Sequence, residues 1–96
     1  MPKINVRKAH NTTLDDAKAK THTMLDMYRE KNASLFSDIK WSADGSSAQV
    51  IGPMFKGSFT VTDRDVNVLI DLKLVATPFK GKVENGLQRT LDKTFG

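Results

Sequence analysis

The stretch GSFTVTDRDVNVLIDL, residues 57–72, restricts the fold more than any other part of the chain. Apolar and polar residues alternate on both sides of Thr62-Asp63-Arg64-Asp65, where aspartate favours a tight turn. Such alternation gives a strand one apolar and one polar face, so the stretch predicts an antiparallel hairpin with one solvated face. The expected inward residues are Gly57, Phe59, Val61, Val66, Val68, Ile70, Leu72 and Leu74, whereas Leu69 and Ile51 are apolar residues on the outer face.

Two further stretches indicate strands. KINVRK, residues 3–8, places Ile4 and Val6 on one face of a strand, with charged and polar residues between them. Farther along, two short β-prone runs flank Ala43-Asp44-Gly45-Ser46, and Asp-Gly is a two-residue hairpin signal because both turn positions need positive φ. The pairs expected across this second hairpin come from Ile39 and Trp41 on one side and Ala48 and Val50 on the other.

The segment after the first strand has the spacing of a helix that lies on a core. Thr13 is the predicted N-cap, because its side chain can accept a hydrogen bond from a first-turn amide, and Asp15 and Asp16 favour the same helix end. The helix is expected to end at residues 31–33, with Asn32 in the left-handed conformation. Its inward stripe consists of Leu14, Ala17, Thr21, Met24, Leu25 and Tyr28.

A second helix is expected near the end of the sequence. Thr77 is the candidate cap, and Pro78 fits the first turn, where its missing amide costs nothing. Gly81 and Gly86 each cost about 1 kcal/mol relative to alanine, so packing must hold this helix, and Gly86 is interpreted as allowing a close contact. The apolar stripe consists of Phe79, Val83, Leu87, Leu91 and Phe95.

The elements follow one another in the order β-α-β-β-β-β-α. A single two-layer α+β domain, with both helices packed on one face of a mainly antiparallel sheet, buries every apolar stripe at once. The 96 residues leave no room for a second domain, so this domain is expected to span residues 1–96. The unpaired edge of a strand, such as that of Ile39 to Trp41, could pair with a second copy and form a homodimer.

Composition excludes several classes of protein. Without cysteine, the chain has no disulfide, no thiolate metal site and no cysteine nucleophile. No apolar run approaches the ~18 residues of a membrane-spanning helix, and the N-terminus lacks an apolar signal region, so a cytoplasmic protein is expected. Fifteen Lys and Arg against eleven Asp and Glu give a net charge of +4, which favours approach to phosphate-rich surfaces.

Few residues indicate catalysis or metal binding. His10 and His22 are the only histidines, and no carboxylate is spaced to complete a metal site with either, so no metal or cofactor is expected. Asp63 and Asp65 are interpreted as turn residues rather than as a cation site. His10 has two interpretations: it makes a hydrogen bond at the junction before Thr13, or it is the base of a small hydrolase or ligand carrier with a pocket between the sheet and the helices.

Two sets of residues are candidates for a binding surface. FKGK, residues 79–82, hints at phosphate binding near a helix start but lacks the full P-loop pattern. The cations that could face RNA phosphates, or simply form a solvated charged face, are Lys3, Arg7, Lys8, Lys18 and Lys20. The apolar residues that could form an exposed patch, or else close loops over the core, are Leu35, Met54, Phe55, Leu69 and Val75.

Several local motifs resemble those of one bacterial family. INVRKAH, residues 4–10, looks like the opening I-x-I-R-R-x-H of the polyhydroxyalkanoic acid system proteins, also described as granule-region proteins. The resemblance covers almost the entire chain, with departures at IGPMFKG and HNTTL. It rests further on Leu14, Ala17, Trp41, the G-x-F-x-V of Gly57, Phe59 and Val61, the V-x-V-x-I-x-L of residues 66–72, and the ending Leu91, Asp92, Phe95 and Gly96.

The resemblance implies a cytoplasmic protein that serves the metabolism of polyhydroxyalkanoate, a bacterial storage polyester deposited in granules. It implies no catalytic residue, so the expected function is that of a non-enzymatic accessory protein that binds the granule surface or a granule protein. The alternative is a small basic domain that binds RNA or the ribosome. The candidate binding residues are Arg7, Lys8 and His10 in the opening motif and Met54, Phe55 and Leu69 in the apolar set.

Overall fold

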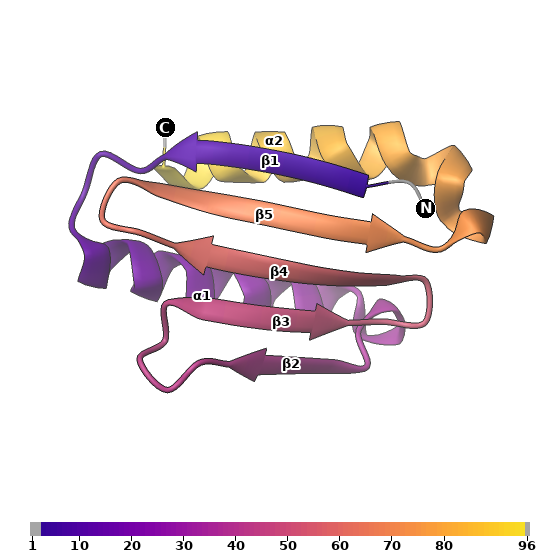
Figure 1. Ribbon diagram of the computed structural model, residues 1–96, viewed down its shortest axis with the longest axis horizontal. Coiled ribbons are helices and arrows are strands. Elements are labelled where there is room, and N and C mark those ends of the chain that lie inside the picture. Colours follow the sequence, from indigo (N-terminus) through magenta and orange to yellow (C-terminus); the bar gives the residue numbers. More distant parts are fainter. Residues whose placement is uncertain (1–2, 96) are drawn as a thin grey trace.

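The computed structural model describes residues 3–95, and these form one sheet backed by helices (Figure 1). The predicted domain bounds, 1–96, also take in residues 1–2 and Gly96, which lie outside the described residues. The strands are β1 (Lys3–Ala9), β2 (Asp38–Trp41), β3 (Ser47–Ile51), β4 (Phe55–Val61) and β5 (Asp65–Leu72). The helices are α1 (Leu14–Lys31) and α2 (Lys80–Phe95), and two short 3₁₀ helices are η1 (Ala33–Leu35) and η2 (Leu74–Phe79).

The five strands lie in the order β1-β5-β4-β3-β2, and every neighbouring pair is antiparallel. Both predicted hairpins are confirmed: Val61 pairs with Val66 across the β4–β5 turn, and Trp41 pairs with Ala48 between β2 and β3. β1 pairs with β5, so the first strand lies beside the last. β2 is an edge strand, as expected for the segment Ile39 to Trp41, and its pairing with a second copy stays a prediction.

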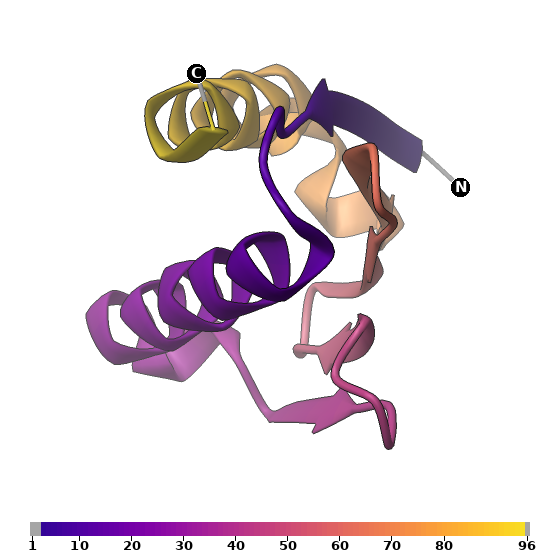
Figure 2. The same cartoon turned by 90° about the vertical axis from the view of Figure 1, so that its left-hand side faces the viewer.

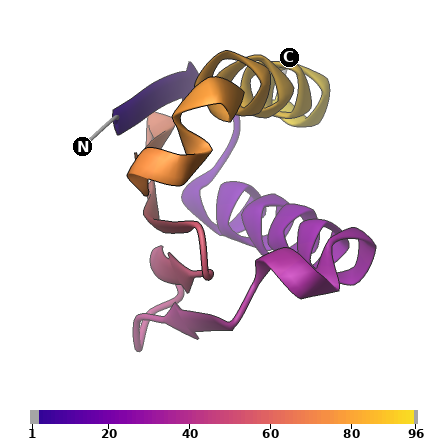
Figure 3. The same ribbon diagram turned by 90° about the vertical axis from the view of Figure 1, so that its right-hand side faces the viewer.

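Both helices lie on the same face of the sheet, which confirms the predicted two-layer α+β fold (Figures 2 and 3). α2 packs against β1, and α1 packs against β4. The alternation of the strands explains the arrangement, because the side chains that point toward the helices are the apolar ones. The core consists of Ile4, Val6, Ala17, Met24, Leu25, Ala48, Val50, Phe59, Val61, Val66, Val68, Ile70, Leu72, Ala76, Leu87, Leu91 and Phe95.

α1 begins and ends where predicted, but the backbone conformation at its end differs from the prediction. The amide of Asp16 donates to the Thr13 hydroxyl at 3.1 Å, which confirms Thr13 as the N-cap. Asn32 has φ −132°, so the expected left-handed conformation is wrong. The backbone amide and the side-chain Nδ2 of Asn32 both donate to the carbonyl of Tyr28, and the chain turns directly into η1, so no left-handed residue is needed.

The β2–β3 connection also differs from the prediction. It runs through residues 42–46 rather than a two-residue turn, and only Gly45 has positive φ, at +73°. The carboxylate of Asp44 accepts hydrogen bonds from the amide and hydroxyl of Ser46 and from the hydroxyl of Ser42. These bonds lower the pKa of Asp44 to about 2 and hold the wider loop.

The second helix begins later than predicted. Pro78 lies inside η2, and α2 begins only at Lys80 rather than after Thr77. β5 ends at Leu72, so Leu74 is not the inward strand residue that the alternation predicts, and its exposed fraction is 72%. Phe79, the first residue of the predicted stripe, is 54% exposed because it belongs to η2 and lies before the part of α2 that packs on the sheet.

The predicted close contact at Gly86 is wrong. A Cβ atom added to Gly86 would meet no heavy atom within 4 Å, and the same is true of Gly81. Gly86 instead lines a pocket that also has residues of α1 and of the sheet in its lining.

Candidate functional site

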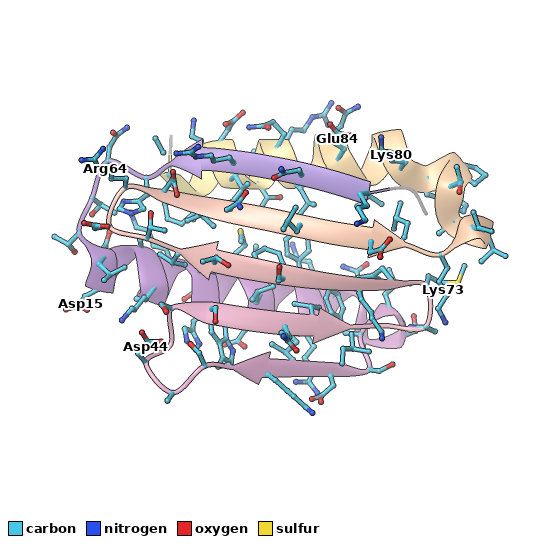
Figure 4. All side chains as sticks on the ribbon, in the orientation of Figure 1. Asp15, Asp44, Arg64, Lys73, Lys80 and Glu84 are labelled. Atoms are coloured by element: carbon cyan, nitrogen blue, oxygen red, sulfur yellow. The ribbon has the colours of Figure 1, made fainter. Side chains whose placement is uncertain are left out.

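The two ends of the molecule differ in their chemistry. The closed end is the end at which β1 stops, α1 begins and the β4–β5 turn lies, and the open end is the opposite one, with η1, η2 and the β3–β4 connection (Figure 1). Side-chain sticks show the same division: Asp15, Asp44 and Arg64 lie toward the closed end, whereas Lys73 and Lys80 lie toward the open end (Figure 4).

His10 is the centre of the closed end and is only 3% exposed. Its Nε2 lies 2.7 Å from the carbonyl oxygen of Thr62, and the amide of Thr12 donates to its Nδ1 at 3.2 Å. These partners assign a neutral imidazole with the hydrogen on Nε2. Both ring nitrogens are therefore occupied by backbone groups, and His10 makes the junction hydrogen bond that was one of its two predicted interpretations.

Arg7 belongs to the same network from the outer face of the sheet. Its Nε donates to Oδ2 of Asp65 at 2.6 Å, and Oδ1 of Asp65 accepts from the Thr62 hydroxyl at 3.0 Å. Desolvation raises the pKa of Asp65, but the hydrogen bonds from Thr62 and Arg7 and the charge of Arg7 lower it more, so the pKa lies below its ordinary value. Arg7 and His10 thus both fasten β1 to the β4–β5 turn.

The predicted basic cluster is divided among separate surfaces and ion pairs. Lys8 pairs with Asp92 of α2 at 3.1 Å, and Lys20 pairs with Asp16 at 3.3 Å, while Arg7 is bound to Asp65. Arg7 lies on the outer face of the sheet, whereas Lys8 shares a face with Ile4 and Val6 and reaches toward α2. No continuous basic face for a phosphate backbone results from these side chains.

The predicted apolar set is also divided. Met54 and Phe55 are half-buried and point to the helix side, whereas Leu69 is 45% exposed on the outer face, where it pairs with Ser58. Phe55 packs edge-on against Phe36, with ring centroids 5.6 Å apart. The structure therefore places Met54 and Phe55 at one site, away from Leu69.

That site is a groove between the two helices, with a volume of about 690 Å³. Its floor is the sheet and its walls are α1 and α2, and we call it the interhelical groove. Cavities of this size are typical of sites for small organic ligands. The groove is lined by Leu25, Tyr28, Asn32, Leu35, Phe36, Val50, Met54, Phe55, Gly57, Phe59, Ile70, Leu72, Ala76, Phe79, Lys82, Val83, Gly86 and Leu87.

Apolar side chains gather on the surface around this groove. Leu74 and Val75 of η2 are 72% and 68% exposed, and Phe79 and Leu35 at the groove itself are 54% and 46% exposed. Ala76 is buried and fixes η2 to the core, while the amide of Lys73 donates to the carbonyl of Met54 at 2.9 Å. The short helix is thus held in a position that exposes its apolar residues to solvent.

Other chemistry finds little support among residues 3–95. No group of three or more His, Asp or Glu side chains there could hold a metal ion, and no helix there is long and apolar enough to cross a membrane. His22 stacks on Trp41 with ring centroids 3.4 Å apart, which joins α1 to the edge strand β2. Asp65 lies in the predicted turn with Thr62, in keeping with its interpretation as a turn residue.

Sequence reasoning allowed a pocket between the sheet and the helices, but as a site with His10 as its base, and His10 does not line the groove. Lys82 was noted only as part of FKGK, Phe79 as part of FKGK and of the helix stripe, and Gly86 as a helix-weakening residue expected to allow a close contact, yet all three line the groove. The available signal was the glycine in the middle of a helix that is otherwise amphipathic, since a conformational cost of this kind often has a structural reason. Asn32, on the opposite wall, was noted only as a helix terminator.

Comparisons with known proteins place the chain in a family. No curated protein and no solved structure matches it. A family model does match, over residues 4–95, a range that contains both the closed end and the interhelical groove. The chain therefore belongs to the family described as "Putative polyhydroxyalkanoic acid system protein", as its opening motif and strand pattern predicted.

Proposed function

We propose that this chain is a non-enzymatic accessory protein of polyhydroxyalkanoate metabolism that binds the surface of the polyester granule through its open end. The single observation that carries the proposal is the group of exposed apolar side chains on η2, Leu74 and Val75 above all. Contiguous apolar surface is uncommon on soluble proteins unless it contacts a partner or an apolar phase. Membership of a polyhydroxyalkanoic acid family identifies a polyester as the apolar phase to test.

The position of η2 supports this role. Because Ala76 is buried and Lys73 is hydrogen-bonded to Met54, exposure of Leu74 and Val75 does not require any part of the core to open. These two residues could enter an apolar surface while the fold stays intact. A cytoplasmic setting, in which such granules lie, is part of the proposal.

The hydrogen bonds of His10, the candidate base, support a non-catalytic role. Both ring nitrogens of His10 are used by Thr62 and Thr12, so a proton transfer to a substrate would first break the closed end. Arg7 is likewise held by Asp65. A structural role therefore accounts for Arg7 and His10 of the opening motif without any catalytic step.

Cosedimentation of the purified protein with isolated granules, at low and at high salt, tests the proposal. Binding should persist at high salt, because apolar contacts are not screened. The double variant Leu74→Ser/Val75→Ser should weaken binding more than about tenfold, since burial of one such side chain is worth roughly 1.5–3 kcal/mol. Leu69→Ser, which alters an exposed leucine on the outer face, is the matched control and should bind normally.

Three outcomes would contradict the proposal. Unchanged binding of the double variant would show that η2 is the wrong surface. Binding lost at high salt would favour the basic residues, and RNA or ribosomes would become the partner to test. Binding to native granules but not to particles of purified polyester would replace the polymer surface with a granule protein as the partner.

A further inference from the structure

Glycine occupies two places in the lining of the interhelical groove. Gly57 lies in the floor, where an added Cβ would come within 3.2 Å of Ile70 Cγ1 and of the carbonyl oxygen of Leu69. Gly86 lies in the α2 wall, where an added Cβ would meet nothing within 4 Å. At the floor, the neighbours of an added Cβ would have to move by a few tenths of an ångström, whereas the space beside the wall could hold a side chain.

The groove has the dimensions of a site for one acyl chain. Its α1 wall extends from Leu25 to the C-cap residue Asn32, a span of seven residue steps or about 10 Å along the helix axis. An extended hydrocarbon chain advances about 1.25 Å per carbon for bonds of about 1.5 Å. Roughly eight carbons therefore match the wall, and the lining between Leu25 and Leu87 is almost entirely apolar.

The mouth of the groove carries a positive charge. Lys82 is exposed, lines the groove from the first turn of α2, and forms no ion pair with any of residues 3–95. Glu84 lies two positions farther along the helix and so projects from a different side. Asn32 lies on the opposite wall, where its side-chain Nδ2 donates to the carbonyl of Tyr28.

From this arrangement we propose that the groove binds a free alkanoic acid of medium chain length, with its acyl chain between the helices and its carboxylate on Lys82. An ammonium paired with a carboxylate forms a charge-assisted hydrogen bond, which supplies orientation in addition to the apolar contacts. The proposal goes beyond granule binding, because Leu74 and Val75, which carry that role, do not line the groove.

Isothermal titration of the full chain with octanoate tests this site. Wild-type protein should bind octanoate, and Gly86→Leu, which fills the empty wall, should weaken binding at least tenfold. Gly81→Leu is the matched control: it makes the same change in the same helix, in open space outside the groove, and should leave the affinity unaltered. Equal octanoate affinity of the Gly86→Leu, Gly81→Leu and wild-type proteins, or no binding by wild type, would overturn the proposal.

The head group is tested separately. Lys82→Gln should weaken octanoate binding about tenfold but leave the binding of 1-octanol, which has no charge, unchanged. An equal loss for both probes would assign Lys82 a structural role and overturn the carboxylate contact. A comparison of octanoate and 3-hydroxyoctanoate binding to the wild-type protein shows whether the groove prefers the hydroxy acid from which such a polyester is built. A preference for either acid supports the acyl-chain site.

A chain-length series on wild type covers the case in which Gly86→Leu fails to fold. Affinity should rise from butanoate to octanoate and change little beyond about ten carbons, because the wall then ends. Affinity that rises steadily to sixteen carbons would indicate non-specific adsorption instead and would overturn the proposal. The two binding roles fail separately: Leu74→Ser/Val75→Ser should keep octanoate binding, and Gly86→Leu should keep granule binding.

Discussion

The closed end and the open end belong to one two-layer fold but are stabilised by different interactions. At the closed end, His10, Thr62 and Asp65 join three elements by hydrogen bonds, and Phe95 lies beside His10 with ring centroids 6.3 Å apart. At the open end, the helices are separated by a groove, and Leu74 is mostly exposed. The two helices are joined directly by the hydroxyl of Tyr28 in α1, which donates to the hydroxyl of Thr90 in α2 at 2.6 Å, so the groove lies beside a contact between them.

The two ends therefore differ in how much their side chains contribute to stability. Buried polar networks fix geometry when every member has a partner, and His10 uses both ring nitrogens. Apolar surface that stays open adds nothing to stability until a ligand or a surface covers it. The structure thus stabilises one end through its own contacts and leaves apolar area exposed at the other.

The largest expected effect is a difference in the free energy of unfolding between a variant of a buried residue and a variant of a groove residue. Leu91 is completely buried in α2, and Leu91→Ala should lower the free energy of unfolding by about 2–5 kcal/mol. Val83 is half-buried beside the groove, and Val83→Ala should cost about 1 kcal/mol or less, because the cavity is already present. Urea unfolding measures both. An equal loss of unfolding free energy in the two variants would show that the groove is filled in solution and would contradict the contrast between the two ends.

A second, intermediate effect concerns the hydrogen bonds of the closed end. His10→Ala leaves the carbonyl of Thr62 and the amide of Thr12 without their partner, at a cost of about 1–3 kcal/mol. Lys82→Ala, an exposed change at the open end, should stay within about 0.5 kcal/mol of wild type. Thermal unfolding of the two variants side by side is the measurement. A His10→Ala protein as stable as Lys82→Ala would mean that water replaces the imidazole without loss.

The smallest effect is a pH dependence confined to the closed end. The pKa of Asp65 is lowered from 3.8 in the folded state, so its contribution to stability is complete above that value and is lost as the pH falls through the lower folded-state pKa. Between about pH 4 and pH 2, wild type should therefore lose more thermal stability than Asp65→Asn. Asp63→Asn, an exposed change in the same turn, is the control and should follow wild type. Parallel curves for wild type and Asp65→Asn would contradict the assignment.

The fold was predictable because its signals are local. Alternation in residues 57–72 determines which face is inward, and that pattern alone assigned Leu69 to the outer face. Phe55 lies two residues before Gly57 in the same strand, so both face inward. This explains why Phe55 and Leu69 do not share a patch. The β2–β3 loop was mispredicted because Asp44 can satisfy a wider turn with its own side chain.

The site was predictable only in part. Arg7 and His10 were recognised from the opening motif, but their partners Asp65 and Thr62 lie 58 and 52 positions away, and no local pattern relates such distant residues. The groove depends on the separation of α1 and α2 across the sheet, which periodicity cannot report. Gly86 illustrates the limit: the sequence shows that it weakens the helix, and only the structure shows the space beside it.

The place of β1 beside β5 has a consequence for the order of folding. The β4–β5 hairpin closes through a short turn and can form in about 1–10 μs, whereas β1 must wait for a partner whose register joins Lys3 to Asp71. α2 packs on β1, so one wall of the groove depends on that late pairing. On a chain still leaving the ribosome, the part of the sheet that α2 covers is therefore exposed, and completion of α2 is the step that buries this aggregation-prone apolar surface.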